Sequence, residues 1–262
     1  MAFTPADVAL HWWRGEDIPS GTPDPLNWDD NIDSWRLQAT GSEIPTYDAT
    51  AINSLPGLDF DGSDDNLVTT TAKLITGTIG VACVANANTN ASEAWVGLTT
   101  SASIPSFGAT TRLYPSPYAS ATDTYYYNGT GVKTYRHKPV LPTTTDLVLS
   151  TVAGPLALGY WSNGATDVFT SGTGTVSPAA FADSMYAHVA NMRSDYRWNG
   201  PICEIVIWNE TYLGERMYIE GFLADKYGIT LQASHPFFAA PPTSAPGSGS
   251  AAVDPIGGGL IP

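Results

Sequence analysis

The chain has 262 residues, of which 43% are hydrophobic and only 14% are charged, and its formal net charge is −14. The apolar fraction is enough for a sizeable core and excludes global disorder. The 11 Lys and Arg residues are scattered, so we expect this acidic chain to bind neither DNA nor RNA. The sequence has no apolar window of about eighteen residues, which predicts no membrane span.

The first third of the chain predicts short strands separated by polar turns. Residues 4–13 are expected to form an opening strand and 15–34 a polar loop, with a second strand starting at Trp35. An acidic turn at 61–65 follows an apolar segment, as in a strand that ends at the surface. Residues 75–87 are rich in β-branched side chains, which predicts one strand buried on both faces.

The middle of the chain has turn-forming residues at the spacing of an all-β fold. Asn128-Gly129 lies between two strand-like runs and is a hairpin signal. Further strands are therefore expected near 94–98, 110–114, 123–128, 132–136, 146–153, 156–161, 185–192 and 202–208.

One amphipathic helix is expected near the C-terminus. Ile219, Phe222, Leu223 and Tyr227 recur at the spacing that places them on one helical face. Gly228 follows at the position where a left-handed residue commonly ends a helix. The pattern therefore predicts a short helix that packs through this apolar stripe.

The composition changes after residue 238. Residues 239–262 are rich in Pro, Gly and Ser and cannot bury a core of their own. We therefore divide the chain into a domain at 1–238 and a C-terminal arm at 239–262. The arm is expected to gain order only from a neighbouring subunit or another protein of the same assembly.

Two cysteines and the N-terminus bear on the cellular compartment. Cys83 and Cys203 both fall in predicted strands, either as buried free thiols or as a disulfide, and the sequence leaves both states open. The first residues carry neither a basic region nor an apolar run, so we expect no secretory signal.

Three segments carry a family resemblance. Residues 55–65 read Leu-Pro-Gly-Leu-Asp-Phe-Asp-Gly-Ser-Asp-Asp and follow the strand at Trp35. Residues 199–209 read Asn-Gly-Pro-Ile-Cys-Glu-Ile-Val-Ile-Trp-Asn, and 219–229 read Ile-Glu-Gly-Phe-Leu-Ala-Asp-Lys-Tyr-Gly-Ile. These segments resemble the concanavalin A-like lectin and glucanase superfamily, in particular laminin-G-like jelly-roll domains of bacteria and phages. The resemblance implies an all-β jelly-roll sandwich with one short C-terminal helix and an extended tail.

The resemblance leaves the activity open, because this architecture hosts lectins, hydrolases and assembly modules. Hydrolases need two carboxylates that flank the scissile bond, and the Glu-x-Asp-x-x-Glu motif of the superfamily's glucanases is absent. Glu204 corresponds to a structural glutamate of the superfamily, and Glu210 lies at the end of the same strand. We therefore expect no catalytic residues, with a glycoside hydrolase as the less favoured alternative.

Four residues are candidates for glycan binding. Tyr126 and Asn128 lie at a predicted hairpin tip, and Trp161 and Asn163 lie in a turn. Aromatic rings can stack on sugars and amides can bond their hydroxyl groups. The alternative is that these aromatic residues pack the sheets, as large aromatic side chains commonly do.

The turn at 61–65 is a candidate for calcium. Asp61, Asp64 and Asp65 place three carboxylates close together, and calcium prefers oxygen ligands. The alternative is that these side chains bond the backbone amides of the turn. We expect no cofactor other than calcium.

These observations favour a non-catalytic structural protein of a virion. The expected role is a phage capsid decoration protein or a head or tail accessory subunit, made in the host cytoplasm and carried on the particle. Its partners would be neighbouring copies or the major capsid or tail protein, contacted through 239–262, with host polysaccharide as a further contact. The alternative is a lectin-like glycan-binding module that is not tied to a particle.

Overall fold

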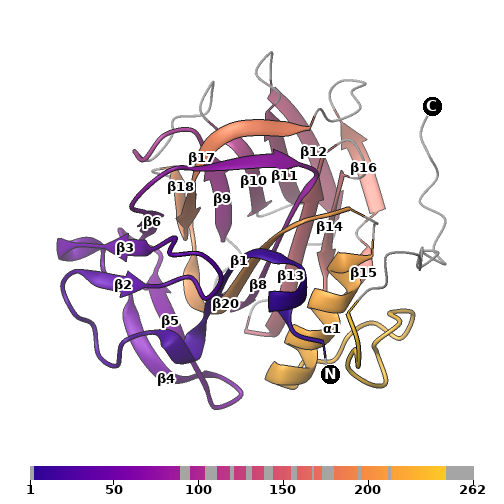
Figure 1. Cartoon of the computed structure of the whole chain (residues 1–262), viewed down its shortest axis with the longest axis horizontal. Helices are drawn as coiled ribbons and strands as arrows, with labels where there is room; N and C mark the ends of the chain where they lie inside the picture. Colours follow the sequence, from indigo (N-terminus) through magenta and orange to yellow (C-terminus); the bar gives the residue numbers. More distant parts are fainter. Residues whose placement is uncertain are drawn as a thin grey trace.

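The computed structural model shows a β-sandwich with one helix packed on its outside (Figure 1). Both large sheets are antiparallel throughout. The fold class expected from the sequence, a jelly-roll-like β-sandwich with one short C-terminal helix, is therefore confirmed. The structure describes residues 3–88, 95–103, 111–118, 121–127, 132–138, 144–154, 158–166, 168–172, 180–193, 196–211 and 214–245.

The first sheet, sheet A, is built around the long strand β20. Within the described residues it has eight strands in the order β15-β14-β13-β8-β20-β5-β4, and β1 pairs with the second half of β20. Its strands are β1 (Ala9–Arg14), β4 (Thr46–Ile52), β5 (Leu55–Asp61), β8 (Ile79–Asn86), β13 (Asp146–Ala153), β14 (Leu158–Ser162), β15 (Ala165–Thr166) and β20 (Asn199–Asn209).

The second sheet, sheet B, has ten strands within the described part of the chain, in the order β16-β12-β11-β10-β9-β17-β6-β3-β2, with β7 paired to β17. Its strands are β2 (Leu26–Trp28), β3 (Leu37–Ala39), β6 (Leu67–Thr69), β7 (Lys73–Gly77), β9 (Val96–Thr99), β10 (Thr111–Tyr118), β11 (Ala121–Tyr127), β12 (Val132–Lys138), β16 (Val168–Gly172) and β17 (Phe181–Val189). A small ribbon and three 3-10 turns complete the set: β18 (Asn191–Arg193), β19 (Tyr196–Arg197), η1 (Pro5–Asp7), η2 (Gly15–Asp17) and η3 (Gly41–Glu43).

The main core lies between the two sheets. Alternating residues of β8 and β20, such as Val81 and Ile205, are fully buried in it against Ala187 of sheet B. Trp13 and Trp35 are also fully buried there, and the Trp13 indole donates to the Trp35 carbonyl at 2.9 Å. Because large aromatic side chains remove so much apolar surface from water, these tryptophans fix the edge of the sandwich near the N-terminus.

Helix α1 (Glu215–Tyr227) covers the outer face of sheet A (Figure 1). The predicted apolar stripe faces the sheet: Ile219 and Leu223 are fully buried and Tyr227 is 1% exposed. Gly228 ends the helix with φ 62°, a left-handed conformation that glycine adopts without steric cost. The helix and its termination are as the sequence predicts.

Several strand predictions need correction. Residues 75–87 were expected to be one strand, but the chain changes sheets there: β7 pairs with β17 in sheet B and β8 belongs to sheet A. Gly77 ends β7 with φ 90°, a backbone conformation that glycine adopts readily and a β-branched residue does not. The predicted loop at 15–34 contains β2, and the sequence analysis missed β4 at the edge of sheet A.

The two cysteines lie on opposite faces of sheet A. Cys83 belongs to the core between the sheets, whereas Cys203 belongs to the cluster under α1. Both are buried free thiols, which settles the alternative that the sequence left open. A disulfide would need side chains that point toward each other, and these point away.

The hairpin predicted around Asn128 agrees with the paired strands, since Tyr127 lies opposite Val132 in the β11–β12 register. The turn itself, Asn128 included, lies outside the described residues. None of the helices in the described ranges is long and apolar enough to cross a membrane.

The C-terminal arm is described only in its first residues. Ala239, Ala240 and Pro241 line a groove of about 190 Å³ together with residues of α1, so this part of the arm lies beside the chain's own helix. The contact with a neighbour was predicted for the whole arm, 239–262, of which residues 246–262 lie outside the described part.

Candidate functional site

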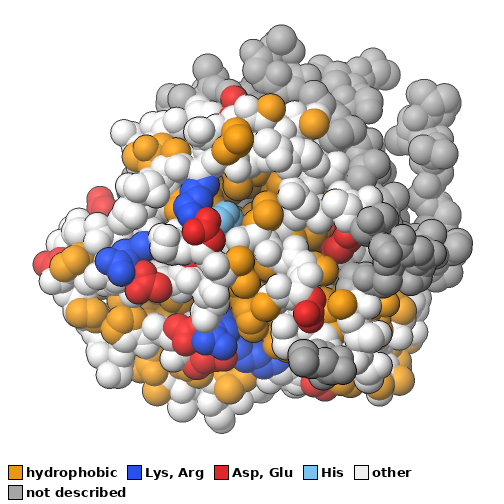
Figure 2. All heavy atoms as spheres, viewed as in Figure 1, with side chains coloured by type: hydrophobic (Ala, Val, Ile, Leu, Met, Phe, Trp, Pro, Cys, Tyr) orange, Lys and Arg blue, Asp and Glu red, His pale blue; other side chains and the backbone are white. Residues whose placement is uncertain are grey.

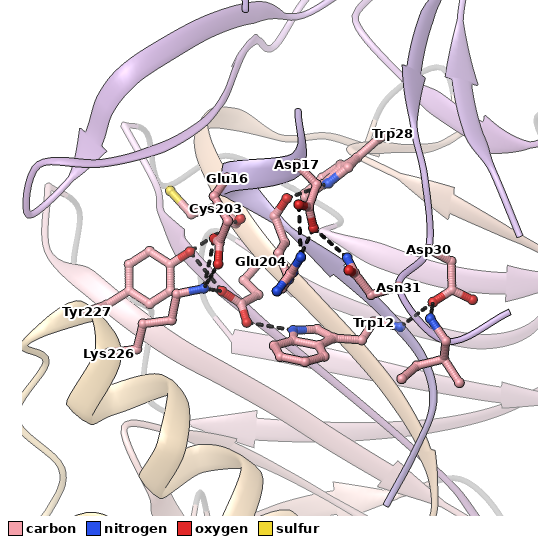
Figure 3. Close-up of polar contacts among 12 residues, drawn as sticks. Trp12, Glu16, Asp17, Trp28, Asp30, Asn31, Cys203, Glu204, Lys226 and Tyr227 are labelled. Carbon is pink, nitrogen blue, oxygen red and sulfur yellow. Dashed lines mark hydrogen bonds and ion pairs between the residues drawn. The ribbon is translucent and has the colours of Figure 1, made fainter. Parts of the chain in front are cut away.

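Glu204 is the centre of a buried polar network that joins α1 to sheet A (Figure 3). Its carboxylate is fully buried and accepts from the Trp12 indole at 2.6 Å, the Tyr227 hydroxyl at 2.9 Å and the Lys226 ammonium at 2.5 Å. Lys226 also pairs with Glu16 at 2.9 Å. One carboxylate therefore ties β20 to β1 and to the last turn of α1.

The Glu204 carboxylate is buried but stabilised by a cation and by three hydrogen bonds. Burial raises the pKa of its carboxyl group, and the charge of Lys226 with the three donated hydrogen bonds opposes that shift. A buried carboxylate with this many donors has its hydrogen-bonding capacity used within the protein. The predicted structural role of Glu204 fits this geometry.

A second buried network fixes the segment that follows α1. Glu220 is fully buried, and its carboxylate accepts from Arg216 at 2.5 Å, lies 3.0 Å from His235 Nε2 and accepts from the Ser150 hydroxyl. Burial alone would raise the pKa of Glu220, but Arg216 and His235 lower it overall. The Arg216 guanidinium also stacks over Trp161, 4.0 Å from the ring centroid. The sequence analysis missed this network.

Glu210 belongs to neither network. It is 2% exposed, and its carboxyl group accepts from the Trp208 indole at 2.6 Å and from the Arg216 backbone amide at 3.3 Å. Burial, with the neighbouring Glu215 carboxylate, raises the pKa of Glu210 to about 8. Glu204 and Glu210, the two acids weighed as a hydrolase pair, thus make separate contacts and line neither of the two pockets identified in the described structure.

The acidic turn brings its three carboxylates together as the sequence predicts. Ligand oxygens of Asp61, Asp64 and Asp65 lie within 4.8 Å of one another. Asp65 Oδ2 accepts from the Asp61 amide at 2.8 Å, and Asp61 Oδ1 accepts from the Ser63 amide at 2.6 Å. Burial, followed by repulsion from Asp61 and Asp64, raises the pKa of Asp65 to about 6. The bonds to turn amides show the structural role, and calcium binding stays a prediction.

The glycan candidates fall in different places. Tyr126 lies in β11, where the structure describes the backbone only, and Asn128 lies outside the described residues. Trp161 is 9% exposed and packs under α1 with Arg216 on its ring, so the packing alternative describes it. Asn163, in the turn between β14 and β15, lines an open cleft. Glycan contact by any of the four stays a prediction.

The cleft beside Asn163 has a volume of about 370 Å³, within the range of small-ligand sites. Its walls come from the β4–β5 turn, the start of β13, the β14–β15 turn and the end of α1. The lining residues are Asn53, Thr145, Asp146, Asn163, Gly228, Ile229 and Thr230. The polar members can exchange hydrogen bonds with hydroxyl groups, and Ile229 adds apolar surface.

The charges on the visible face are mostly paired. Figure 2 shows groups of Lys and Arg side chains that each lie beside Asp or Glu side chains. The ion pairs include Arg36–Asp29 at 2.6 Å and the contact between Lys73 and Asp33. On the described atoms of this face, the Lys and Arg side chains gather in no patch free of acidic neighbours.

Comparison with known proteins identifies solved structures of similar fold. A sialidase from Trypanosoma rangeli matches over 84% of this chain with a TM-score of 0.56 and 11% identity. Domain 4 of AbnA, an extracellular GH43 arabinanase from Geobacillus stearothermophilus, matches over 77% of this chain with a TM-score of 0.54 and 11% identity. No protein-family model matches the sequence, nor does any curated protein.

The two matches differ in how much of the other protein they include. This chain spans 33% of the sialidase, so it corresponds to one part of that enzyme. It spans 92% of the arabinanase domain, which is therefore similar over nearly its whole length. At 11% identity these matches show a common β-sandwich fold and carry no residue roles to this chain.

Proposed function

We propose that this chain is a non-catalytic subunit on the outside of a bacteriophage particle, as a capsid decoration protein or a head or tail accessory protein. We further propose that it belongs to the concanavalin A-like superfamily and that its sandwich contacts polysaccharide of the host. The observation that carries the glycan part of the proposal is the open polar cleft at Asn163, and the intramolecular bonds of the buried glutamates support the non-catalytic part.

The contacts of the glutamates support the non-catalytic role. Most glycosidases use two carboxyl groups about 5–10 Å apart on either side of a substrate. Glu204 and Glu220 bond to cations and hydroxyl groups of the protein itself, and Glu210 is buried beneath the start of α1. Burial and these intramolecular bonds support a structural role for the three carboxyl groups.

The contact with glycan is supported by the cleft and by one similar structure. The cleft offers amide, carboxylate and hydroxyl groups at the surface. The arabinanase domain of similar fold was solved in complex with arabinotriose. A domain of this fold can therefore hold an oligosaccharide, which supports glycan contact by this chain.

The test of glycan binding uses the full chain. We expect retention of at least one bacterial surface polysaccharide in affinity electrophoresis, without release of reducing ends. Retention of none, with calcium present or absent, would remove the glycan part of the proposal.

The placement on a particle has its own test. We expect mass spectrometry of purified particles from the source phage to find the chain in fixed stoichiometry with the capsid or tail protein. A chain lacking 246–262 should fold normally and fail to join the particle. If the full chain stays in the lysate and is absent from particles, the lectin-like alternative replaces the virion role.

A further inference from the structure

We infer that the cleft between the β4–β5 turn and the end of α1 is the saccharide site and that it takes neutral, hydroxyl-rich sugars rather than acidic ones. The inference rests on the proposed glycan function and adds a location, named residues and a charge class to it.

The first observation is where the non-glycine residues with positive φ gather. The described residues include five non-glycine residues with positive φ: Asn53 (48°), Ser54 (66°), Thr144 (56°), Asn163 (48°) and Ala190 (65°). All except Ala190 either line the cleft or adjoin in sequence a residue that does. A positive φ at threonine is an outlier because its branched side chain crowds the backbone. Asn53, Ser54 and Asn163 lie in two-residue hairpin turns, in which positive φ is the usual conformation and gives each turn a defined shape. Thr144 alone is strained, and it adjoins the cleft residue Thr145, a placement typical of ligand sites.

The second observation is which polar atoms the protein leaves for a ligand. Asn53 Nδ2 donates to the Tyr227 carbonyl, which leaves Oδ1 as an acceptor. Asn163 Oδ1 accepts from the Val148 amide at 2.8 Å, which leaves Nδ2 as a donor. These structural bonds also fix the orientation of each amide. The cleft therefore presents acceptors and donors together, as the hydroxyl groups of a sugar require.

Asp146 supplies the charged acceptor of the cleft. Its Oδ1 accepts from Asn86 Nδ2 at 2.7 Å, and Oδ2 has no partner among the described contacts. A carboxylate oxygen accepts hydrogen bonds from sugar hydroxyl groups more strongly than a neutral acceptor does.

The charge of the cleft sets the class of sugar. The lining includes Asp146 and no Lys, Arg or His. The wall at Gly228 and Ile229 is the end of α1, where the helix dipole presents its negative pole. Both features repel carboxylates such as those of uronic and sialic acids, and both tolerate uncharged hydroxyl groups. The inferred ligand is therefore a neutral saccharide.

The anchors described above hold this wall in position. Tyr227 and Lys226, just before the cleft residue Gly228, bond directly to Glu204. The amide of Ile229 also closes the helix by donating to the Ala224 carbonyl at 2.8 Å. A wall fixed before binding loses little conformational freedom on binding, which favours affinity.

The test titrates the full chain with maltotriose, cellotriose and arabinotriose as neutral probes and with trigalacturonate and sialyllactose as acidic probes. Asn163→Asp keeps the acceptor for Val148 and replaces the donor Nδ2 with an acceptor. Asp146→Asn keeps an oxygen for Asn86 and removes the charge. Glu43→Gln removes an exposed charge outside the cleft and is the matched control.

We expect calorimetry to detect at least one neutral probe and neither acidic one. Each cleft variant should lower the affinity for the neutral probe about tenfold or more, because each loses a hydrogen bond to a sugar hydroxyl group. Glu43→Gln should leave that affinity unchanged. Amide NMR of the wild-type chain should show the probe shifting the side-chain signals of Asn53 and Asn163, which keeps the test valid if a variant is unstable.

Three outcomes overturn the inference in distinguishable ways. If a neutral probe binds equally to wild type and both cleft variants, and shifts signals elsewhere, the site is wrong while the glycan function stands. If an acidic probe binds more tightly than every neutral one, the charge class is wrong. If no saccharide of any kind is retained, in this panel or in affinity electrophoresis, the proposed glycan function fails and the inference fails with it.

Discussion

Replacing Lys226 with methionine tests whether the Glu204 network anchors α1. Methionine keeps most of the aliphatic stem and removes the ammonium group that pairs with Glu204 at 2.5 Å. Glu204 then remains fully buried with only the Trp12 and Tyr227 donors. Breaking a buried ion pair by removing one partner costs about 3–5 kcal/mol.

The lower end of that range applies here, because the Lys226 side chain is 19% exposed and two donors to Glu204 survive. We therefore expect Lys226→Met to lower the free energy of unfolding by about 3 kcal/mol. With a urea m-value of about 3 kcal/mol/M for a chain of this size, the midpoint should fall by about 1 M. Urea unfolding followed by tryptophan fluorescence and by circular dichroism measures this shift.

The controls separate the buried pair from the exposed one. Glu16→Gln removes only the outer partner of Lys226, whose side chain is 44% exposed, and should cost about 0.5 kcal/mol or less. The double variant Glu204→Gln with Lys226→Met leaves no uncompensated charge and should regain most of the loss. If Lys226→Met costs no more than Glu16→Gln, the anchoring role of the pair is refuted.

The pH dependence of Lys226→Met has a defined sign. The Lys226 charge opposes the rise that burial imposes on the pKa of Glu204, so its removal raises that pKa further. A carboxyl group with a raised pKa in the folded state favours folding at low pH and loses that contribution as pH rises through the folded-state pKa. The variant should therefore lose less stability at pH 5 than at pH 8.

Three further predictions concern the core and the buried acid. Gly80→Ala should lower stability by about 1–3 kcal/mol, because an added Cβ would lie 2.1 Å from the fully buried Trp208 ring; an unchanged urea midpoint would contradict this packing. The folded-state pKa of Glu210 is raised to about 8, so wild type should lose stability between about pH 4.5 and pH 8, and thermal melts should show that Glu210→Gln removes this loss; equal slopes in both proteins would refute it. Cys83 and Cys203 face opposite sides of sheet A, so oxidant should leave electrophoretic mobility and melting temperature unchanged, and a mobility shift that dithiothreitol reverses would contradict the arrangement.

The sequence predicted the parts of the fold that depend on local pattern. The stripe from Ile219 to Tyr227 specifies a buried helix face because its period matches the helix, and Gly228 ends the helix because it adopts positive φ readily. The pairing of β11 with β12 followed from the turn signal at Asn128-Gly129 between two strand-like runs. The break at Gly77 was missed because β-branched residues on both sides mask a change of sheet that only long-range pairing reveals.

The candidate site was less predictable for the same reason. Asn163 was found from its turn, but Asn53 and Asp146 are distant in sequence and meet it only because three turns lie at one end of sheet A. The Glu220 network was missed because Ser150 and His235 are distant in sequence and meet Glu220 only where α1 packs on β13. For Trp161 the sequence left glycan binding and packing open, because its burial under Arg216 depends on where α1 packs.

The most direct test of the whole account measures binding and turnover of the same saccharides in one experiment. The full chain would be incubated with labelled neutral oligosaccharides, and both bound label and newly released reducing ends would be quantified. The account predicts saturable binding that Asn163→Asp weakens, with no release above the rate in buffer. Release of reducing ends that depends on the protein, and that disappears when Glu204 or Glu210 is replaced with glutamine in a folded variant, would contradict the account.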